Sequence, residues 1–146
     1  SLVMDTYSFG YSSSGFTDMP MNHKIFLAQF DAIKKLASEG PCVMVGRCAD
    51  YALSEYKDCF SVFVHADIDW RINRLSQKHN KTAKEAKDMI NKTDKSRSSY
   101  YNYYTNKKWG AASSYNLCVD SSKLGIDGAA KAIIQAIEIF DSIKNK

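Results

Sequence analysis

Three short apolar runs, each followed by a turn or polar residues and then by a helical pattern, constrain the fold of this chain most. The runs lie at residues 42–45, 59–65 and 116–120. A short apolar run between turn signals is typical of a strand that is buried on both faces, as in parallel sheets. Because helical patterns separate the runs, the chain alternates between the two kinds of element. This order predicts an α/β fold in which helices wrap a parallel sheet.

Several residues mark where the predicted helices begin. Apolar residues recur three and four positions apart at 22–38, and a short helix is expected at 49–56. Side chains with an oxygen acceptor at the first position cap a helix by binding its free N–H groups. The predicted N-caps are Asn22, Asp67 and Asp127, and Thr82 with Glu85 has the pattern of a capping box.

Length and composition exclude several classes of protein. With 146 residues, 45% hydrophobic and 25% charged, the chain fits one ordinary globular domain. No apolar run approaches the ~20 residues of a membrane helix, and no secretory signal opens the chain, so we expect no membrane partner. The four cysteines form no CxxC pair and the three histidines lack ligand spacing. We therefore expect no metal site formed by the protein and a reducing, cytoplasmic location.

Positive charge is concentrated in the centre of the chain. Residues 67–110 hold 11 of the 20 Lys and Arg residues but five of the 16 Asp and Glu residues. A local positive field of this kind suits a polyanionic partner that binds at one place.

Arginines follow the ends of the predicted strands. Arg47 follows the first apolar run, Arg71 and Arg74 follow the second, and Arg97 lies three residues after Asp94. Ligands of open α/β sheets bind outside the carboxyl ends of the strands, and guanidinium groups bind phosphate bidentately. The pattern therefore predicts a site for a polyphosphate. By contrast, Gly10-x4-Gly15 lacks the strand and lysine of a phosphate-binding loop, so we expect a flexible surface loop there.

Seven stretches of the chain resemble the cytidylate kinase-like family, a bacterial branch of the nucleoside-monophosphate kinases. Together they cover nearly the whole chain from about Met21. The most specific are Gly46-Arg-Cys-Ala-Asp50, within the stretch 40–51, and Tyr100-Tyr-Asn-Tyr-Tyr104. The others are Phe26–Phe30, Val62–Asp67, Lys92–Arg97, Lys108–Gly110 and Leu117–Ser122.

The resemblance implies a three-layer α/β/α P-loop kinase-like fold with a parallel sheet and a helical lid insertion. It implies one kinase-like domain over residues 1–146, incomplete at its N-terminus, with the lid at about 77–112. It also implies transfer of the γ-phosphoryl group of ATP, with Mg²⁺, to a (d)CMP-like nucleoside monophosphate in the complete parent protein.

Roles for individual residues follow from the same resemblance. The implied catalytic residues are Arg71, Arg74, Asp94 and Arg97. The implied contacts to the donor nucleotide are Arg71, Arg74 and Ser121. The implied contacts to the acceptor monophosphate are Arg47, Asp50 and Tyr101.

The Gly-rich phosphate loop of the family, with its opening strand and helix, is not found in these 146 residues. Without those backbone N–H donors the triphosphate lacks its main cradle, so the chain as written is not expected to be an active kinase. We expect a parent protein with a further N-terminal segment, because three buried parallel strands alone would leave a central edge unpaired.

Two other functions remain open from the sequence. One is a regulatory module that binds a phosphorylated ligand without turnover. The other is nucleic-acid binding through the basic, tyrosine-rich segment 67–110, which would show a steep dependence of affinity on salt. This function is disfavoured because the positive residues follow strand ends and a capped helix rather than one flat face.

Overall fold

A computed structural model describes residues 19–144 of the chain, and the side chains from residue 21. The loop expected between Gly10 and Gly15 lies outside the described residues. The chain divides into two compact units, residues 1–44 and 45–146. The two units are described separately below.

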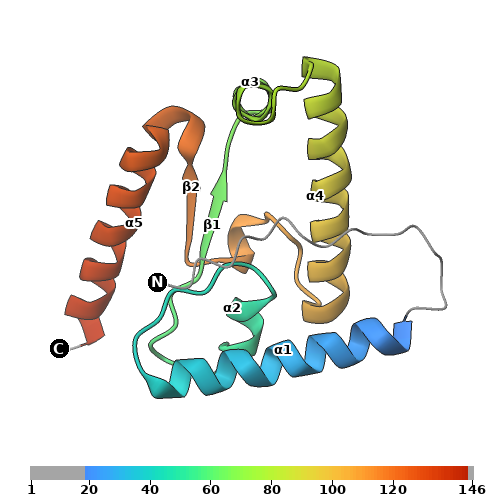
Figure 1. Ribbon diagram of the computed structural model, residues 1–146. Helices are drawn as coiled ribbons and strands as arrows, with labels where there is room; N and C mark the ends of the chain where they lie inside the picture. The colour runs from blue at the N-terminus through green and yellow to red at the C-terminus, as the bar shows by residue number, and fades with distance from the viewer. Residues whose placement is uncertain (1–18, 145–146) are drawn as a thin grey trace. The chain divides into compact units, whose positions relative to one another are not determined.

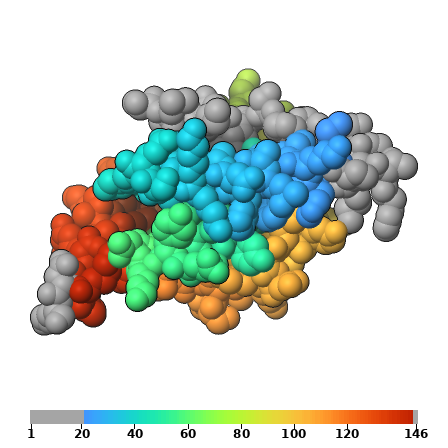
Figure 2. Space-filling view, turned by 90° about the horizontal axis from the view of Figure 1, so that it is seen from below, coloured from blue at the N-terminus to red at the C-terminus, as the bar shows by residue number. Residues whose placement is uncertain are grey.

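The first unit contains helix α1, Met19–Glu39. The helix predicted at 22–38 is therefore confirmed, but it begins three residues before Asn22, which is not its N-cap. Phe26 and Ile33 are buried, and the ring centroids of Phe26 and Phe30 lie 5.9 Å apart. Figure 2 shows much of the surface of α1 open to view, and Leu27 and Leu36 are about half exposed.

The apolar run after α1 does not form the predicted strand. Residues 41–45 have no regular secondary structure, and Val43 and Val45 are 94% and 79% exposed. A strand is stabilised by a neighbour that pairs its backbone groups. Among the described residues the sheet consists of two later strands alone, so this run has no ladder to join. The prediction of a buried strand at 42–45 is wrong for this structure.

The second unit is built on a parallel pair of strands, β1 (Val62–His65) and β2 (Leu117–Asp120). Val62 is opposite Leu117, and His65 is opposite Asp120. Figure 1 shows the two strands side by side, with α5 running along β2. The structure confirms a mostly helical α/β chain with a small parallel sheet. The full three-layer P-loop architecture remains a prediction.

Helices connect and cover the two strands. The helices of this unit are α2 (Ala49–Ala52), α3 (Ile68–His79), α4 (Ala83–Thr105), the 3₁₀ turn η1 (Ala112–Ser114) and α5 (Ser121–Lys144). None of the helices in the described part of the chain is both apolar and long enough to cross a membrane.

Two of the predicted caps are present. The carboxylate of Asp67 accepts hydrogen bonds from the N–H groups of Asp69 and Trp70, and Thr82 and Glu85 form the complete capping box. The last helix differs from its prediction, because it begins at Ser121 rather than at Asp127 and kinks at Gly125, where φ is 69°. The caps satisfy free N–H groups in the first turns of α3 and α4, and the two helices pack against each other.

Candidate functional site

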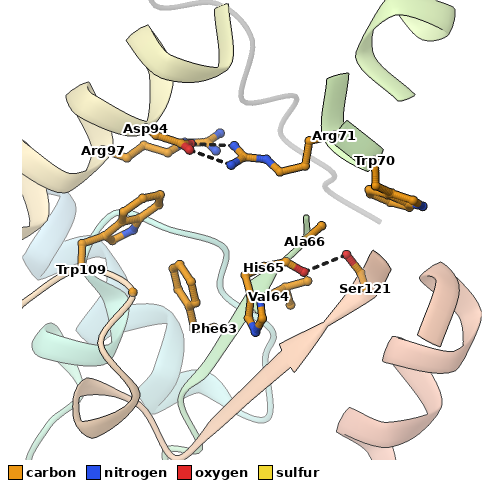
Figure 3. A pocket seen from close by; sticks show the side chains of 11 residues that line it. Phe63, Val64, His65, Ala66, Trp70, Arg71, Asp94, Arg97, Trp109 and Ser121 are labelled. Atoms are coloured by element: carbon orange, nitrogen blue, oxygen red, sulfur yellow. Dashed lines mark hydrogen bonds and ion pairs between the residues drawn. The ribbon is translucent and has the colours of Figure 1, made fainter. Parts of the chain in front are cut away.

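A cavity of about 430 Å³ opens at the carboxyl end of β1, within the second unit. Figure 3 shows its lining, which comes from β1 and the residue after it, from the first turn of α3, from the middle of α4, from the segment before β2 and from the first residue of α5. The lining residues are Phe63, Val64, His65, Ala66, Trp70, Arg71, Asp94, Arg97, Trp109, Gly110 and Ser121. This is the edge of a parallel sheet at which ligands bind in open α/β folds.

Hydroxyl groups tie the ends of the two strands together at the floor of the cavity. Ser121 Oγ donates to the carbonyl oxygen of His65 at 3.1 Å, and the N–H of Asp67 donates to Ser122 Oγ at 3.1 Å. Ser122 also donates to the carboxylate of Asp120, which lowers the pKa of that carboxyl group. These bonds fix where α3 begins, and so where Trp70 and Arg71 enter the cavity.

The charged wall of the cavity joins α3 to α4. Arg71 donates from its two terminal nitrogens to the two carboxylate oxygens of Asp94, at 2.7 and 2.8 Å. Asp94 and Arg97 are three residues apart and so lie on the same side of α4. Figure 3 shows Arg97 beside the Arg71–Asp94 pair. The wall therefore carries two cations and one anion, a net positive charge.

Aromatic rings form the wall below the arginines. The ring of Phe63 meets the indole of Trp109 edge to face, with centroids 5.2 Å apart, and stacks on Tyr115 at 4.9 Å. Tyr115 in turn stacks on Tyr101 at 5.9 Å. On the α3 side the guanidinium of Arg74 lies 5.6 Å from the ring centroid of Trp70. The cavity thus places planar apolar surface next to positive charge.

The structure places four of the sequence-predicted residues on this cavity, namely Arg71, Asp94, Arg97 and Ser121. Arg74 is not on the lining and contacts the ring of Trp70 instead. The three residues predicted on the acceptor side, Arg47, Asp50 and Tyr101, are not on the lining either.

Asp50 and Tyr101 form a contact of their own. The hydroxyl of Tyr101 donates to Asp50 at 2.7 Å, and Lys107 Nζ lies 3.8 Å from the same carboxylate oxygen. Burial and the carboxylate of Asp50 both raise the pKa of Tyr101. Asp50 also lines a second, more polar cavity of about 290 Å³ near the amino ends of the strands. The hydrogen bond ties α4 to α2.

Arg47 lies just before α2, in an unusual backbone conformation. Gly46, Arg47 and Cys48 have positive φ values of 70°, 56° and 55°. Side chains other than glycine rarely adopt this conformation, and positions that keep it often serve a function. Burial raises the pKa of Tyr100 to about 12, and the nearby charge of Arg47 opposes that rise. Arg47 is thus held in an exposed turn close to Tyr100.

Comparison with known protein families matches residues 1–123 to the cytidylate kinase-like family. The match includes both strands and every residue that lines the cavity. The chain belongs to the cytidylate kinase-like family. Membership implies a kinase-like fold and, in general terms, the binding of nucleotides.

A solved structure supports this assignment. The crystal structure of an uncharacterized protein from Eubacterium ventriosum is similar to this member of the cytidylate kinase-like family, with a TM-score of 0.77 and 34% sequence identity. The similarity covers 80% of this chain and 74% of that chain. A search of curated proteins found no match.

Sequence reasoning gave no role to four residues that the structure places on the cavity of this kinase-like protein: Phe63, His65, Trp70 and Trp109. Phe63, His65 and Trp109 lie in stretches that carry the family resemblance, and the glycine after Trp109 is a turn signal. No signal in the sequence indicated that Phe63 would lie against it, because 45 residues separate the two.

Proposed function

We propose that the cavity at the end of β1 binds the phosphate groups of a nucleotide. We further propose that the complete parent protein transfers the γ-phosphoryl group of ATP to a (d)CMP-like nucleoside monophosphate. The observation that carries the proposal is the placement of Arg71 and Arg97 on one cavity beside aromatic rings. Positioning and neutralisation of negative charge supply most of the catalysis of phosphoryl transfer, and arginines are suited to both.

The ion pair with Asp94 leaves Arg71 able to bind phosphate. A guanidinium group has five N–H donors, and Asp94 accepts from one on each terminal nitrogen. The remaining donors of Arg71, together with those of Arg97, can bind phosphate oxygens while Asp94 keeps Arg71 in place. In this proposal Arg71 and Arg97 are catalytic residues and Asp94 is a positioning residue, while Ser121 lies at the donor side.

On the acceptor side we propose Arg47 as the ligand of the monophosphate. The support is its strained turn, which precedes α2 directly. Asp50, on α2, and Tyr101, on α4, join the two helices by their hydrogen bond and so support the position of that turn. Arg74 is proposed to act through Trp70, whose ring it covers.

The cavity does not fit a magnesium ion held by the protein itself. Mg²⁺ in phosphate-transferring sites binds one or two carboxylates in addition to phosphates and water. Asp94 supplies the one carboxylate among the described residues that line the cavity. Both of its oxygens accept hydrogen bonds from Arg71. We therefore assign the metal no residue of this chain and derive no step from it.

Calorimetric titration with CMP, dCMP and ATP tests the binding proposal. Arg97→Ala is expected to weaken nucleotide binding at least 10-fold, since a charge-assisted bond to phosphate is lost. Lys95→Ala is the matched control, because it removes the same charge from an exposed position of α4 that does not line the cavity. Equal affinities for the two variants would contradict the proposed site.

A second candidate is a module that binds nucleotide without turnover. It is favoured by the engagement of Asp94 with Arg71, which leaves no unengaged carboxylate on the described lining to accept a proton. Assay of γ-phosphoryl transfer from radiolabelled ATP to CMP by the complete parent protein distinguishes the two. Labelled CDP would support the kinase, whereas binding without any labelled product would support the module.

A further inference from the structure

We propose that Trp109 is the residue on which the base of the bound nucleotide stacks, so that the cavity selects nucleotides over sugar phosphates with little preference among bases. The inference rests on the proposed function, which it makes more specific. It starts from the position of the indole on the same cavity as the two arginines. A nucleotide needs both surfaces, one flat and apolar and one positively charged.

The turn that carries Trp109 is fixed before any ligand arrives. The N–H of Trp109 donates to Asn102 Oδ1 at 2.7 Å, which ties the turn to α4. The carbonyl oxygen of Lys108 accepts hydrogen bonds from the N–H of Ala111 at 3.2 Å and from Ser114 Oγ at 2.9 Å. A ring held in place in this way loses little conformational freedom when a ligand stacks on it.

The backbone after Trp109 packs directly on β1. Gly110 has a φ of 75°, and a Cβ atom at this position would lie 3.3 Å from the ring of Phe63. The close approach lets the indole meet the Phe63 ring edge to face at 5.2 Å. Phe63 in turn is supported by Tyr115. The indole is therefore braced from the sheet as well as from α4.

Within the part of the chain that the structure describes, the bracing leaves one face of the indole without a ring contact. An edge-to-face contact occupies at most one face of a ring. Among the described residues, Phe63 is the one aromatic residue whose ring contacts the indole of Trp109. The other tryptophan on the cavity, Trp70, differs because the guanidinium of Arg74 lies over its ring. Figure 3 shows Trp109 on the α4 side, below Arg97, and Trp70 on the α3 side.

The chemistry of stacking predicts the kind of selectivity. Each base stacked on an aromatic side chain contributes about 1–3 kcal/mol by alanine substitution, and every base has a face that can stack. This corresponds to about 5- to 150-fold in affinity. Trp109 should therefore separate nucleotides from sugar phosphates and leave recognition of the individual base to other groups.

The test compares AMP, CMP and ribose 5-phosphate by calorimetry. The proteins compared are the one without substitution and the variants Trp109→Leu, Trp109→Phe and Tyr103→Ala. Leucine keeps apolar packing without a ring, and phenylalanine keeps a smaller ring. Tyr103→Ala is the aromatic control, because Tyr103 is 60% exposed on α4 and does not line the cavity.

We expect Trp109→Leu to weaken AMP and CMP binding about 10-fold and ribose 5-phosphate binding less than twofold. Trp109→Phe should retain most of the affinity, and Tyr103→Ala all of it. Trp109→Leu affecting the three ligands equally, or not at all, would overturn the inference. The proposed function would survive that result if Arg97→Ala still weakened AMP binding, whereas both would fail if no phosphate compound bound.

Fluorescence gives an independent reading in the folded protein. The chain has two tryptophans, so Trp70→Phe leaves Trp109 as the only indole. AMP should quench the emission of this variant, and ribose 5-phosphate at equal occupancy should not. Emission that does not respond to AMP while AMP binds would exclude stacking on Trp109.

Discussion

Arg71 on α3 and Asp94 on α4 form a bidentate ion pair, with N–O distances of 2.7 and 2.8 Å, at the cavity where the strands end. Their side chains are 30% and 26% exposed, so water screens the pair only in part. The pair links α3 to α4 at the cavity. It fixes Arg71, one of the two arginines on the cavity lining.

A double-mutant cycle measures this link. Arg71→Ala, Asp94→Ala and the double variant are expected to give a coupling free energy of about 1 kcal/mol, because the geometry is bidentate but the pair is partly screened. The measurement is urea unfolding followed by circular dichroism. Single-variant effects that simply add would show that the pair does not hold α3 to α4.

Substitution of Gly110 tests the close approach of the Trp109 turn to β1. Gly110→Ala is expected to destabilise the protein by about 2 kcal/mol, since alanine is strained at positive φ and its Cβ would crowd Phe63. Gly46→Ala is the control, because Gly46 also has positive φ but has open space around it. Gly46→Ala should lower the free energy of unfolding by about 1 kcal/mol, which is the contribution of the strained backbone alone. Equal costs in thermal unfolding would contradict the packing on Phe63.

The capping box of α4 should make stability depend on pH. Hydrogen bonds from the backbone and hydroxyl of Thr82 lower the pKa of Glu85. A lowered pKa means that the stabilisation is complete above the ordinary value of about 4.3 and is lost as the pH falls through the lower, folded value. The free energies of unfolding of the unsubstituted protein and of Glu85→Gln, plotted against pH, should therefore converge at acid pH. Curves that stay parallel down to low pH would rule out this contribution.

Thr82→Ala tests the other half of the same box. Loss of the hydroxyl that accepts the N–H of Glu85 is expected to cost about 1 kcal/mol in the free energy of unfolding. Ser98→Ala is a control on the same helix, because its hydroxyl donates to a carbonyl one turn earlier and caps nothing. A cost for Thr82→Ala no larger than that for Ser98→Ala would contradict the cap.

The cysteines should differ in reactivity. Burial, and to a smaller extent the charge of Asp50, raise the pKa of Cys48 to about 11. Cys42, by contrast, is exposed. Because the thiolate is the reactive form, iodoacetamide at pH 8 should modify Cys42 well before Cys48 in the folded protein. Mass spectrometry of peptides after timed labelling measures both rates. The two rates should become similar only after denaturation. Similar rates in the native protein would show that Cys48 is not buried.

Substitutions of Arg47 test the acceptor side of the proposal. Arg47→Ala in the complete parent protein is expected to weaken monophosphate binding at least 10-fold and to change the free energy of unfolding little. Arg47→Lys should restore little of the affinity, since an ammonium group lacks the planar fork. Unchanged acceptor affinity in Arg47→Ala would remove this residue from the site.

Features that depend on neighbouring residues were predictable from the sequence. The N-cap at Asp67 and the box of Thr82 and Glu85 form as predicted, because the groups that bind each other lie within three residues. The parallel strands were also found, although each is shorter than its apolar run. The strand predicted at 42–45 failed because hydrophobicity alone does not supply a pairing partner.

The site illustrates the limit of local pattern. Arg71 and Arg74 stand three residues apart on one side of α3, and the sequence treats them alike. In the structure Asp94 binds Arg71, while Arg74 covers Trp70 and stays off the cavity. The choice between them depends on where α4 crosses α3, which is a property of the tertiary packing.

The sequence by itself determined where two of the helices begin, the two apolar runs that pair as strands, and the concentration of positive charge that suits a polyanionic ligand. These follow from short-range hydrogen bonding, periodicity and charge. Only the tertiary structure decided which cations share a cavity and which rings face them. Phe63 and Trp109 are 5.2 Å apart in space, yet they belong to segments separated by two helices. Their meeting depends on the parallel crossover that brings β2 beside β1, and no local pattern encodes that distance.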